Sequence, residues 1–455
     1  MKRCLAEFAS AMNGQLIGPD TSFSAVSTDS RTCEAGSLFF ALKGERFDGH
    51  DFVAAASQRG VAAIVVDHRC DVGVPQIIVQ DTLVALQAAA AGWRKNFQIP
   101  VIGVAGSNGK TTTKEMIARI FEQRGACLAT QGTLNNHIGV PLTLLSIDAR
   151  HAFAVIEIGA NHPGEVAALT KLVEPSIAVV TNAGAEHLEG FGSLAGAARA
   201  EGELFEGLGS SAAAIINADD EFADLWRALN RADTVVSFGQ LSQADCCVSG
   251  EIDVSGIAGE RQRFTLVTPT GTAAVELPLA GAHNVLNALA ASAVAHAAGI
   301  SAVEIASGLA DMRAVKGRLV VKSASAGGCV IDDSYNANPS SFEAGIKVLA
   351  TASGERWVVL GNMAELGSVE VAAHREAGLF ARNAGVSRLF TLGDSAALAA
   401  DAFGDGAEKF FDANELAQHI KPMIAPGITV LVKGSRVNRL ERVVDAIAAQ
   451  PNERS

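Results

Sequence analysis

The 455-residue chain has little of several residue types, and each shortage excludes a class of protein. It contains seven cysteines, an odd number with no Cys-x-x-Cys pair, which argues against a disulfide framework or a zinc site and predicts buried thiols in a reducing compartment. No uninterrupted run of 18 apolar residues occurs, and Glu7 interrupts the N-terminal segment before a signal-like stretch can form. We therefore expect a soluble, cytoplasmic protein without membrane insertion.

Positive charge is also scarce, because 49 acidic residues outnumber 36 basic ones and give a net charge of −13. This balance disfavours a general nucleic-acid binder, so an anionic ligand must be held by local clusters of positive charge. The single tyrosine, Tyr335, is interpreted as a packing residue. Apolar residues are plentiful at 49%, and the length predicts about three domains.

The most informative segment is 101–113, where an apolar strand leads through a glycine loop into a helix. Backbone N–H groups of such a loop can surround a polyphosphate, Lys110 adds a positive charge, and the Thr111 hydroxyl can reach Mg²⁺. Val104 stands where the longer phosphate-loop consensus has glycine, so the match is to the short Gly-x-x-Gly-Lys-Thr form. We predict a nucleotide phosphate site formed by Gly106, Ser107, Asn108, Gly109, Lys110, Thr111 and Thr112.

Two further predicted strands bring candidate side chains to the predicted phosphate site. The strand predicted over 153–159 has Glu157 near its end, and the strand over 177–181 leads to His187. Ligands of open α/β sheets collect at the carboxyl ends of strands, so Glu157 is placed to bind Mg²⁺ beside Thr111. A surface carboxylate and a hydrogen-bonding loop histidine are the alternatives that the pattern leaves open.

Other polar clusters are candidate ligand contacts, and each has a simpler structural alternative. Segments 27–31 and 43–52 could hold a base and phosphates, or form a capped helix start or a loop. Segment 132–141 suits a carboxylate or phosphate, or forms a turn. In the alanine-rich helix predicted to open at 281–288, Asn284 and Asn287 share one face, where they could bind a purine or cap the first turn.

The order of predicted elements indicates an α/β protein of three domains. Residues 1–83 form a small α/β domain, and residues 84–311 form a parallel-sheet domain with an antiparallel patch over 246–278. Residues 312–455 form a Rossmann-like, doubly wound domain. Asp333 and Lys433 follow predicted strands of this last domain and are its chemical candidates.

Several separated motifs together resemble the Mur ligases, the ATP-dependent amide-forming enzymes of peptidoglycan synthesis. The resemblance covers essentially the whole chain and rests on segments 106–113, 133–136, 157–159, 187–192, 283–287, 317–318, 332–339 and 433–435. The block 336–339, Asn-Ala-Asn-Pro, together with 27–31, resembles the D-alanyl-D-alanine-adding branch. The Asp-Asn-Pro-Arg block expected of the diaminopimelate-adding branch does not occur.

The resemblance implies a UDP-sugar-binding first domain, a P-loop ATPase-like central domain that binds ATP·Mg²⁺, and a C-terminal domain that closes over the site. It implies a monomer with UDP-N-acetylmuramoyl-tripeptide and D-alanyl-D-alanine as substrates, joined through an acyl phosphate. The implied catalytic residues are Lys110, His187 and Lys433, with Asn284, Asn287, Arg318 and Asp333 added to the ATP site. The implied substrate residues are Ser27, Asp29, Ser30, Arg31, Lys43, Arg46, Phe47, Asn135, Asn136, Asn336 and Asn338. The implied metal ligands are Thr111, Glu157, His187 and Glu201.

Glu201 departs from the family pattern. The family usually has, fourteen residues after the histidine equivalent to His187, a lysine that is carbamylated by CO₂ and helps hold a second Mg²⁺. Here the position is Glu201. We hypothesise that Glu201 supplies the anionic group directly and that activity does not depend on bicarbonate. The alternative is a weakened second metal site with Glu201 facing solvent.

Two other classes of function stay open at this level. Another amide ligase of the family, diaminopimelate-adding or of the folylpolyglutamate type, would share the ATP site. A non-catalytic nucleotide-binding regulator would fit the two departures from consensus, Val104 and Glu201.

Overall fold

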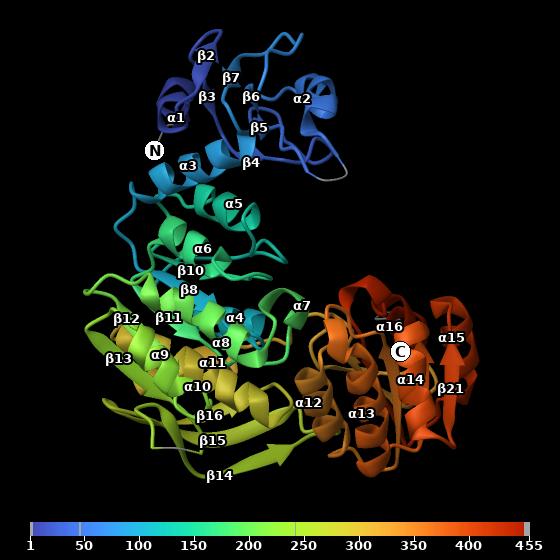
Figure 1. The fold of residues 1–455 in the computed structure, drawn as a ribbon. Helices are drawn as coiled ribbons and strands as arrows, with labels where there is room; N and C mark the ends of the chain where they lie inside the picture. Colours follow the sequence, from blue (N-terminus) through green and yellow to red (C-terminus); the bar gives the residue numbers. More distant parts are fainter. Residues whose placement is uncertain (1–2, 45–46, 242, 450–455) are drawn as a thin grey trace.

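The computed structural model describes residues 3–44, 47–241 and 243–449, which form three α/β units (Figure 1). The units follow one another along the chain, and the central one lies at the corner of an L-shaped molecule (Figure 1). Within these ranges, no helix is both long enough and apolar enough to span a bilayer. All seven cysteines are described and each is a free thiol. The prediction of no disulfide framework is therefore confirmed, although only Cys33, Cys246 and Cys329 are fully buried.

The N-terminal unit is built on a mixed sheet whose strands are ordered β2-β7-β6-β5-β4 in the described chain. Strand β2 is antiparallel to β7, and the other pairs are parallel. Strands β5 and β6 are apolar and fully buried. The elements are β1 (Arg3–Cys4), α1 (Leu5–Ala11), β2 (Gln15–Ile17), β3 (Ser22–Phe23), β4 (Val26–Ser27), β5 (Leu38–Phe40), η1 (Gly49–Phe52), α2 (Val53–Gln58), β6 (Ala63–Val66) and β7 (Gln76–Ile78).

Helix α3 (Thr82–Arg94) connects the first two units. Asp81 caps it by accepting the N–H groups of Leu83 and Val84. Near its other end, the buried Trp93 packs 5.8 Å from Phe8 of α1 and donates its indole N–H to a carbonyl of the central unit. The predicted boundary between residues 83 and 84 thus falls inside a helix that packs on both units.

The central unit contains a fully parallel sheet, in agreement with the prediction. Within the described residues its order is β13-β12-β11-β8-β10-β9, so β8 lies between β11 and β10. The carboxyl ends of these three strands therefore meet at one edge. The elements are β8 (Val101–Ala105), α4 (Lys110–Glu122), β9 (Cys127–Ala129), α5 (Gly139–Leu145), β10 (Phe153–Glu157), α6 (Glu165–Val173), β11 (Ile177–Val180), α7 (Leu188–Phe191), α8 (Leu194–Glu206), β12 (Ala213–Asn217), α9 (Ala223–Leu229) and β13 (Thr234–Phe238).

The predicted antiparallel patch is also confirmed. Strands β14 (Cys247–Ser255), β15 (Arg261–Thr268) and β16 (Gly271–Leu277) form a meander. Helices α10 (Ala282–Ala297) and α11 (Ala302–Ala310) pack between this meander and α4. The small alanine side chains of α10 let it approach α4 closely, which brings its first turn to the glycine loop.

The C-terminal unit has the expected doubly wound sheet, ordered β17-β18-β22-β19-β20-β21 in the part of the chain described. Among these described strands, only β17 is antiparallel to its neighbour. The parallel register of β18 and β22 sets Asp333 directly beside Lys433. The elements are β17 (Val320–Ser323), β18 (Cys329–Asp333), α12 (Pro339–Leu349), β19 (Glu355–Gly361), η2 (Gly367–Val369), α13 (Glu370–Asn383), β20 (Arg388–Leu392), α14 (Asp394–Phe403), β21 (Ala407–Phe410), α15 (Ala413–Ile420), η3 (Lys421–Met423), β22 (Ile428–Lys433), η4 (Arg436–Asn438) and α16 (Glu441–Ile447).

Candidate active site

A cavity of about 930 Å³ is lined by residues of both the central and the C-terminal units. Most of the residues singled out from the sequence meet there. These are Ser107, Asn108, Gly109, Lys110, Thr111, Thr112, Asn135, Asn136, Glu157, His187, Asn284, Asn287, Arg318, Asp333, Asn336, Asn338 and Lys433. Among the described candidates, Gly106, Glu201 and the residues of the N-terminal unit do not line it.

Two glycines allow the phosphate loop to pack tightly. Gly106 has φ +118° and Gly109 has φ +84°, in the region that favours glycine. A Cβ atom on Gly106 would lie 2.2 Å from the Thr181 hydroxyl, and one on Gly109 would lie 2.3 Å from the Asn287 amide oxygen. The loop is thus pressed between the end of β11 and the first turn of α10.

The loop's backbone N–H groups divide into two sets. Three of them donate to protein oxygens: Gly106 to Glu201 Oε2 at 2.7 Å, Ser107 to the Asn182 carbonyl at 2.9 Å, and Asn108 to Asn182 Oδ1 at 3.0 Å. Helix α4 begins at Lys110, so the N–H groups of its first turn have no acceptor within the helix. The first turn of α4, rather than the whole loop, is therefore the part best placed to bind an anion.

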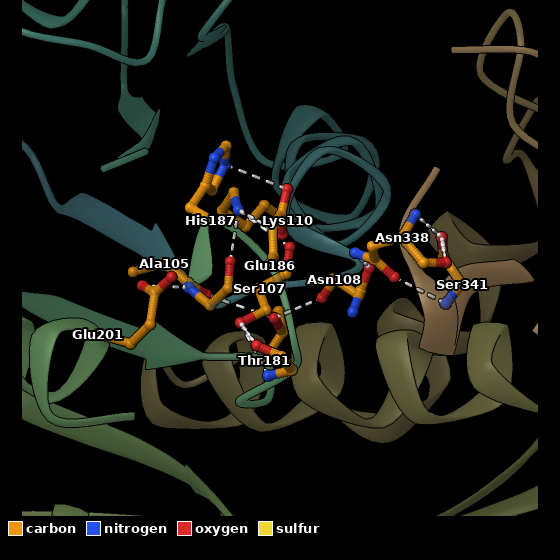
Figure 2. A network of polar contacts seen from close by, with 12 residues as sticks. Ala105, Ser107, Asn108, Lys110, Thr181, Glu186, His187, Glu201, Asn338 and Ser341 are labelled. Atoms are coloured by element: carbon orange, nitrogen blue, oxygen red, sulfur yellow. Dashed lines mark hydrogen bonds and ion pairs between the residues drawn. The ribbon is translucent and has the colours of Figure 1, made fainter. Parts of the chain in front are cut away.

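Lys110 lies in a partly buried ion pair that sequence reasoning missed. Its Nζ donates to the carbonyls of Gly106 and Ser107 at 2.5 and 3.0 Å and lies 3.9 Å from Glu186 Oε2 (Figure 2). Burial opposes the charge of Lys110, but Glu186 and nearby carboxylates raise its pKa above the ordinary value. Burial likewise opposes the charge of Glu186, but Lys110 and His187 lower its pKa below the ordinary value. Both side chains are therefore charged. The available sequence signal was a carboxylate immediately before His187.

Glu157 carries an unsatisfied oxygen at the end of β10. It is 2% exposed, so the surface alternative is wrong. Its Oε1 accepts from Asn135 Nδ2 at 2.9 Å, while its Oε2 is buried without a hydrogen-bond partner among the described residues. The nearby Thr111 hydroxyl accepts from Arg318 Nη2 at 3.0 Å. Buried carboxylate and hydroxyl oxygens are ligands that Mg²⁺ prefers, so these residues fit such an ion.

The side chain of His187 contacts a carboxylate of the C-terminal unit. Its Nδ1 contacts Glu365 Oε2, and its Nε2 lies 3.4 Å from Glu186 Oε1. Burial opposes protonation, but Glu186 and Glu365 together raise the pKa of the imidazole above its ordinary value. Sequence reasoning missed Glu365 because 178 positions separate it from His187.

Glu201 lies behind the phosphate loop rather than in solvent. It is 4% exposed, and it holds the loop through the bond from Gly106 (Figure 2). The solvent-facing alternative is therefore wrong. Burial raises the pKa of its carboxyl group, although Lys110 and the Gly106 N–H act in the opposite direction. Its role as a metal ligand stays a prediction.

The C-terminal unit contributes a second ion pair, which is buried. Lys433 Nζ lies 2.6 Å from Asp333 Oδ2 and donates to the Asn336 carbonyl at 3.0 Å. Burial raises the pKa of Asp333, and the charge of Lys433 partly offsets this effect. The Arg318 guanidinium lies 4.4 Å above the Tyr335 ring. Tyr335 thus lines the cavity as well as packing.

The asparagines in the cavity have different roles. The amide of Asn287 donates to Asn284 Oδ1 at 3.0 Å, and α10 has no side-chain cap, so the capping alternative for this pair is wrong. Asn136 instead accepts the N–H groups that begin α5, which fits the turn alternative. Asn338 caps α12 and also donates to Asn108 Oδ1 at 2.9 Å, across the two units.

The described candidates of the N-terminal unit lie at the end of β4, in the case of Ser27, and in the loops that follow β4 and β5. After β4, Asp29 accepts from the Arg31 backbone and guanidinium, and these bonds lower the Asp29 pKa to about 2. Lys43 lies 4.0 Å from Asp48, and Phe47 is 73% exposed. The ligand-binding roles of Ser27, Asp29, Ser30, Arg31, Lys43 and Phe47 stay predictions, and Arg46 lies outside the described residues.

Comparisons with known proteins show which family this chain resembles in sequence and structure. The chain matches the models of the Mur ligase family catalytic domain (residues 22–118), the Mur ligase middle domain (104–295) and the Mur ligase glutamate ligase domain (317–436). It is 43% identical to the UDP-N-acetylmuramoyl-tripeptide--D-alanyl-D-alanine ligase of Escherichia coli, over 97% of this chain and 98% of that protein.

Solved structures give the same result. A MurF from Acinetobacter baumannii superposes with a TM-score of 0.91 at 34% identity, covering 98% of both chains. A MurF ligase from Thermotoga maritima in complex with ADP gives a TM-score of 0.82 at 27% identity, covering 93% of this chain and 96% of that one.

Proposed function

This chain belongs to the Mur ligase family, and we propose that it joins D-alanyl-D-alanine to UDP-N-acetylmuramoyl-tripeptide with cleavage of ATP to ADP and phosphate. The observation that supports this most directly is that one cavity is lined by Lys110 and Lys433, from different units, together with the buried carboxylate of Glu157. Two cations and a carboxylate around one space suit the transfer of a phosphoryl group.

The residues around the cavity divide the binding of ATP between them. The phosphates lie against the first turn of α4, where Lys110 offsets their charge from one side and Lys433 from the other. The adenosine contacts Asn284, Asn287 and Arg318, and Asp333 binds the ribose. Thr111, Glu157 and His187 would hold Mg²⁺, which would supply positive charge to neutralise the phosphates.

The reaction has two steps. An oxygen of the tripeptide carboxylate attacks the γ-phosphorus of ATP, so an acyl phosphate forms and ADP leaves. The amine of D-alanyl-D-alanine then attacks the acyl carbon, loses a proton, and phosphate leaves with formation of the amide. The protein does little covalent work: Lys110 and Lys433 stabilise charge on the transferred group, and the C-terminal unit excludes water that would hydrolyse the acyl phosphate.

The UDP-linked substrate is bound by residues of all three units. The loops of the N-terminal unit around Arg31 and Phe47 bind the UDP end of the substrate, and Asn135, Asn136, Asn336 and Asn338 contact its peptide end. The protein acts as a monomer in the cytoplasm, where it supplies peptidoglycan synthesis and so supports cell shape and division. Glu201 supplies directly the anionic group that a carbamylated lysine supplies elsewhere in the family, so turnover does not require bicarbonate.

A substrate assay tests the function. The purified protein is given ATP, Mg²⁺ and UDP-tripeptide, with and without D-alanyl-D-alanine, and both phosphate release and the mass of the product are measured. We expect phosphate and a UDP-pentapeptide only when the dipeptide is present. Stimulation by diaminopimelate or glutamate instead would identify another ligase of the family, and no release with any amine would identify a regulator. Loss of turnover in CO₂-free buffer, restored by bicarbonate, would overturn the role given to Glu201.

A further inference from the structure

The C-terminal unit holds the histidine that the central unit presents to the cavity. Glu365, in the segment between β19 and η2, contacts Nδ1 of His187. The other ring nitrogen, Nε2, points to Glu186, which lines the cavity. One nitrogen is thus held from across the boundary between the units, and the other faces Glu186 in the wall of the cavity.

Glu365 is presented by a loop with fixed ends. The Met363 N–H donates to His374 Nε2 at 2.9 Å, and the Ala364 N–H donates to Ser435 Oγ at 2.8 Å. Leu366, on the other side of Glu365, is buried. The Glu365 carboxylate therefore does not depend on a freely moving surface loop for its position.

Both partners have an unusual backbone. Glu365 has φ +63° and His187 has φ +52°, values that cost energy in residues other than glycine. Such conformations persist only where the surrounding structure enforces them, and they gather at functional sites. Their occurrence on both sides of one contact, in two units, indicates that the pair is built into the fold.

The same loop is tied to the phosphate-facing part of the C-terminal unit. Ser435, which holds Ala364, follows Lys433 by two residues and donates its hydroxyl to the Ala337 carbonyl at 3.2 Å. Glu365, Lys433 and the asparagine block around Ala337 are therefore positioned together. A movement that docks Lys433 at the cavity also docks Glu365 at His187.

We propose that Glu365 is a positioning residue for the ligase reaction. Its carboxylate accepts the N–H of His187 Nδ1, which fixes the ring and its tautomer and leaves the lone pair of Nε2 available in the cavity. Histidines that bind metals commonly donate their second N–H to a carboxylate in this way. This inference rests on the proposed function, in which His187 is a metal ligand. It adds that His187 becomes competent only when the C-terminal unit is docked.

Kinetics of the full-length enzyme give the first test. Glu365→Gln keeps the size of the side chain but removes its charge, and Glu376→Gln makes the same change at an exposed position of α13 in the same unit. Loss of an outer-shell partner of a metal ligand typically costs about 10–100-fold in activity, so we expect kcat to fall by that factor in Glu365→Gln with KM values near wild type. Glu376→Gln should match the wild type. Glu365→Asp, which keeps an acceptor, should recover part of the rate.

A double variant tests whether Glu365 acts through His187. His187→Gln combined with Glu365→Gln should be no slower than His187→Gln alone, because the positioned group is already absent. The proposal would be overturned if the loss of kcat in the double variant equalled the product of the losses in the two single variants. So would a Glu365→Gln enzyme with wild-type kcat, or an equal loss in Glu376→Gln.

Histidine NMR separates this inference from the proposed function. With Mg²⁺ and a non-hydrolysable ATP analogue, the ¹⁵N spectrum of His187, assigned with His187→Gln, should show protonated Nδ1 and unprotonated Nε2. In Glu365→Gln the population should move toward the other tautomer. This readout needs no turnover, so it holds even if D-alanyl-D-alanine proves to be the wrong amine. Identical His187 signals in the two proteins would overturn the positioning role.

Discussion

Two lysines dominate the electrostatics of the cavity, the partly buried Lys110 and the buried Lys433, and each is paired with a carboxylate. Lys110 faces Glu186 and Lys433 contacts Asp333, so both positive charges are held in place in the cavity, where the proposed function has them bind the phosphates. A buried charge without a partner is costly, since removing one member of such a pair costs about 3–5 kcal/mol. The carboxylates therefore keep both lysines charged inside the protein.

Replacing Lys110 tests the phosphate site at the level of one residue. Lys110→Met should lower the rate of product formation by roughly 10²–10³-fold, the usual effect of losing one group that stabilises charge in the transition state. Lys95→Met, at an exposed lysine 4.0 Å from Glu174, serves as the control. Circular dichroism checks that both variants fold. Undiminished ATP-dependent product formation by Lys110→Met would contradict the assignment of the loop.

His283 should make stability depend on pH. Burial and the charge of Lys433 lower its pKa to about 4 in the folded protein, against an ordinary value of 6.5. At a pH between these two values, His283 is protonated in the unfolded chain and neutral in the folded protein. The contribution of neutral His283 to the free energy of unfolding is therefore fully present above about pH 6.5. It is lost as the pH falls toward 4, and the total loss is at most about 3 kcal/mol.

Urea unfolding of the wild type and His283→Gln at pH 7, 6 and 5 measures this effect. The stability of the wild type should fall more steeply toward pH 5 than that of the variant, because glutamine does not titrate. Taking the difference between the two proteins cancels the titration of the carboxylates elsewhere in the cavity. Parallel curves would show that His283 titrates normally in the folded state.

Among the elements, helix α12 links local stability to the contact between units. Asn338 accepts the Ser341 N–H in a capping box, and its amide nitrogen reaches Asn108 of the phosphate loop. Pro339 at the first helical position favours the same helix start. The cap thus fixes the end of α12 that meets the loop.

Two substitutions separate these roles of Asn338. Asn338→Ala removes the cap and the bond to Asn108 and should cost about 1–2 kcal/mol of stability. Asn338→Asp keeps an acceptor at the N-terminus of the helix, where a negative charge is favourable, and should stay close to the wild type. Denaturant unfolding measures both, and Ser301→Ala, in the capping box of α11 away from the cavity, gives the cost of a cap alone. An equal loss in Asn338→Asp and Asn338→Ala would show that the cap contributes nothing.

For the whole molecule, the elements and the sheet edge at which the candidate site residues lie could be predicted from the sequence. Apolar runs that end at Glu157, Asp333 and Lys433 mark buried parallel strands, and the rules of α/β sheets place their ends together. The phosphate loop was recognisable because its glycines and lysine are close in sequence. These features depend on local pattern, which a single chain displays.

The partners of these residues could not be predicted in the same way. Glu365 reaches His187, Arg318 reaches Thr111 and Glu201 reaches Gly106 only through packing between segments about 100 to 200 positions apart. No local pattern distinguishes Glu365 from the many other glutamates of the chain. The reading of Glu201 as a metal ligand came from its position after His187, whereas its bond to the loop depends on how α8 packs behind β8.

Hydrogen exchange should reveal the coupling between units that this arrangement requires. Lys110 lies on α4 of the central unit and Lys433 ends β22 of the C-terminal unit, so one ATP molecule held by both should slow exchange in both segments. A non-hydrolysable ATP analogue with Mg²⁺ at about 100 times its Kd stabilises the protein by about 2.7 kcal/mol, enough to be measured by mass spectrometry. In Lys433→Met the analogue should still protect 106–113 but no longer 428–435, because the phosphates then have no cation on the C-terminal side. Equal protection of both segments in that variant would mean that Lys433 does not contact the nucleotide.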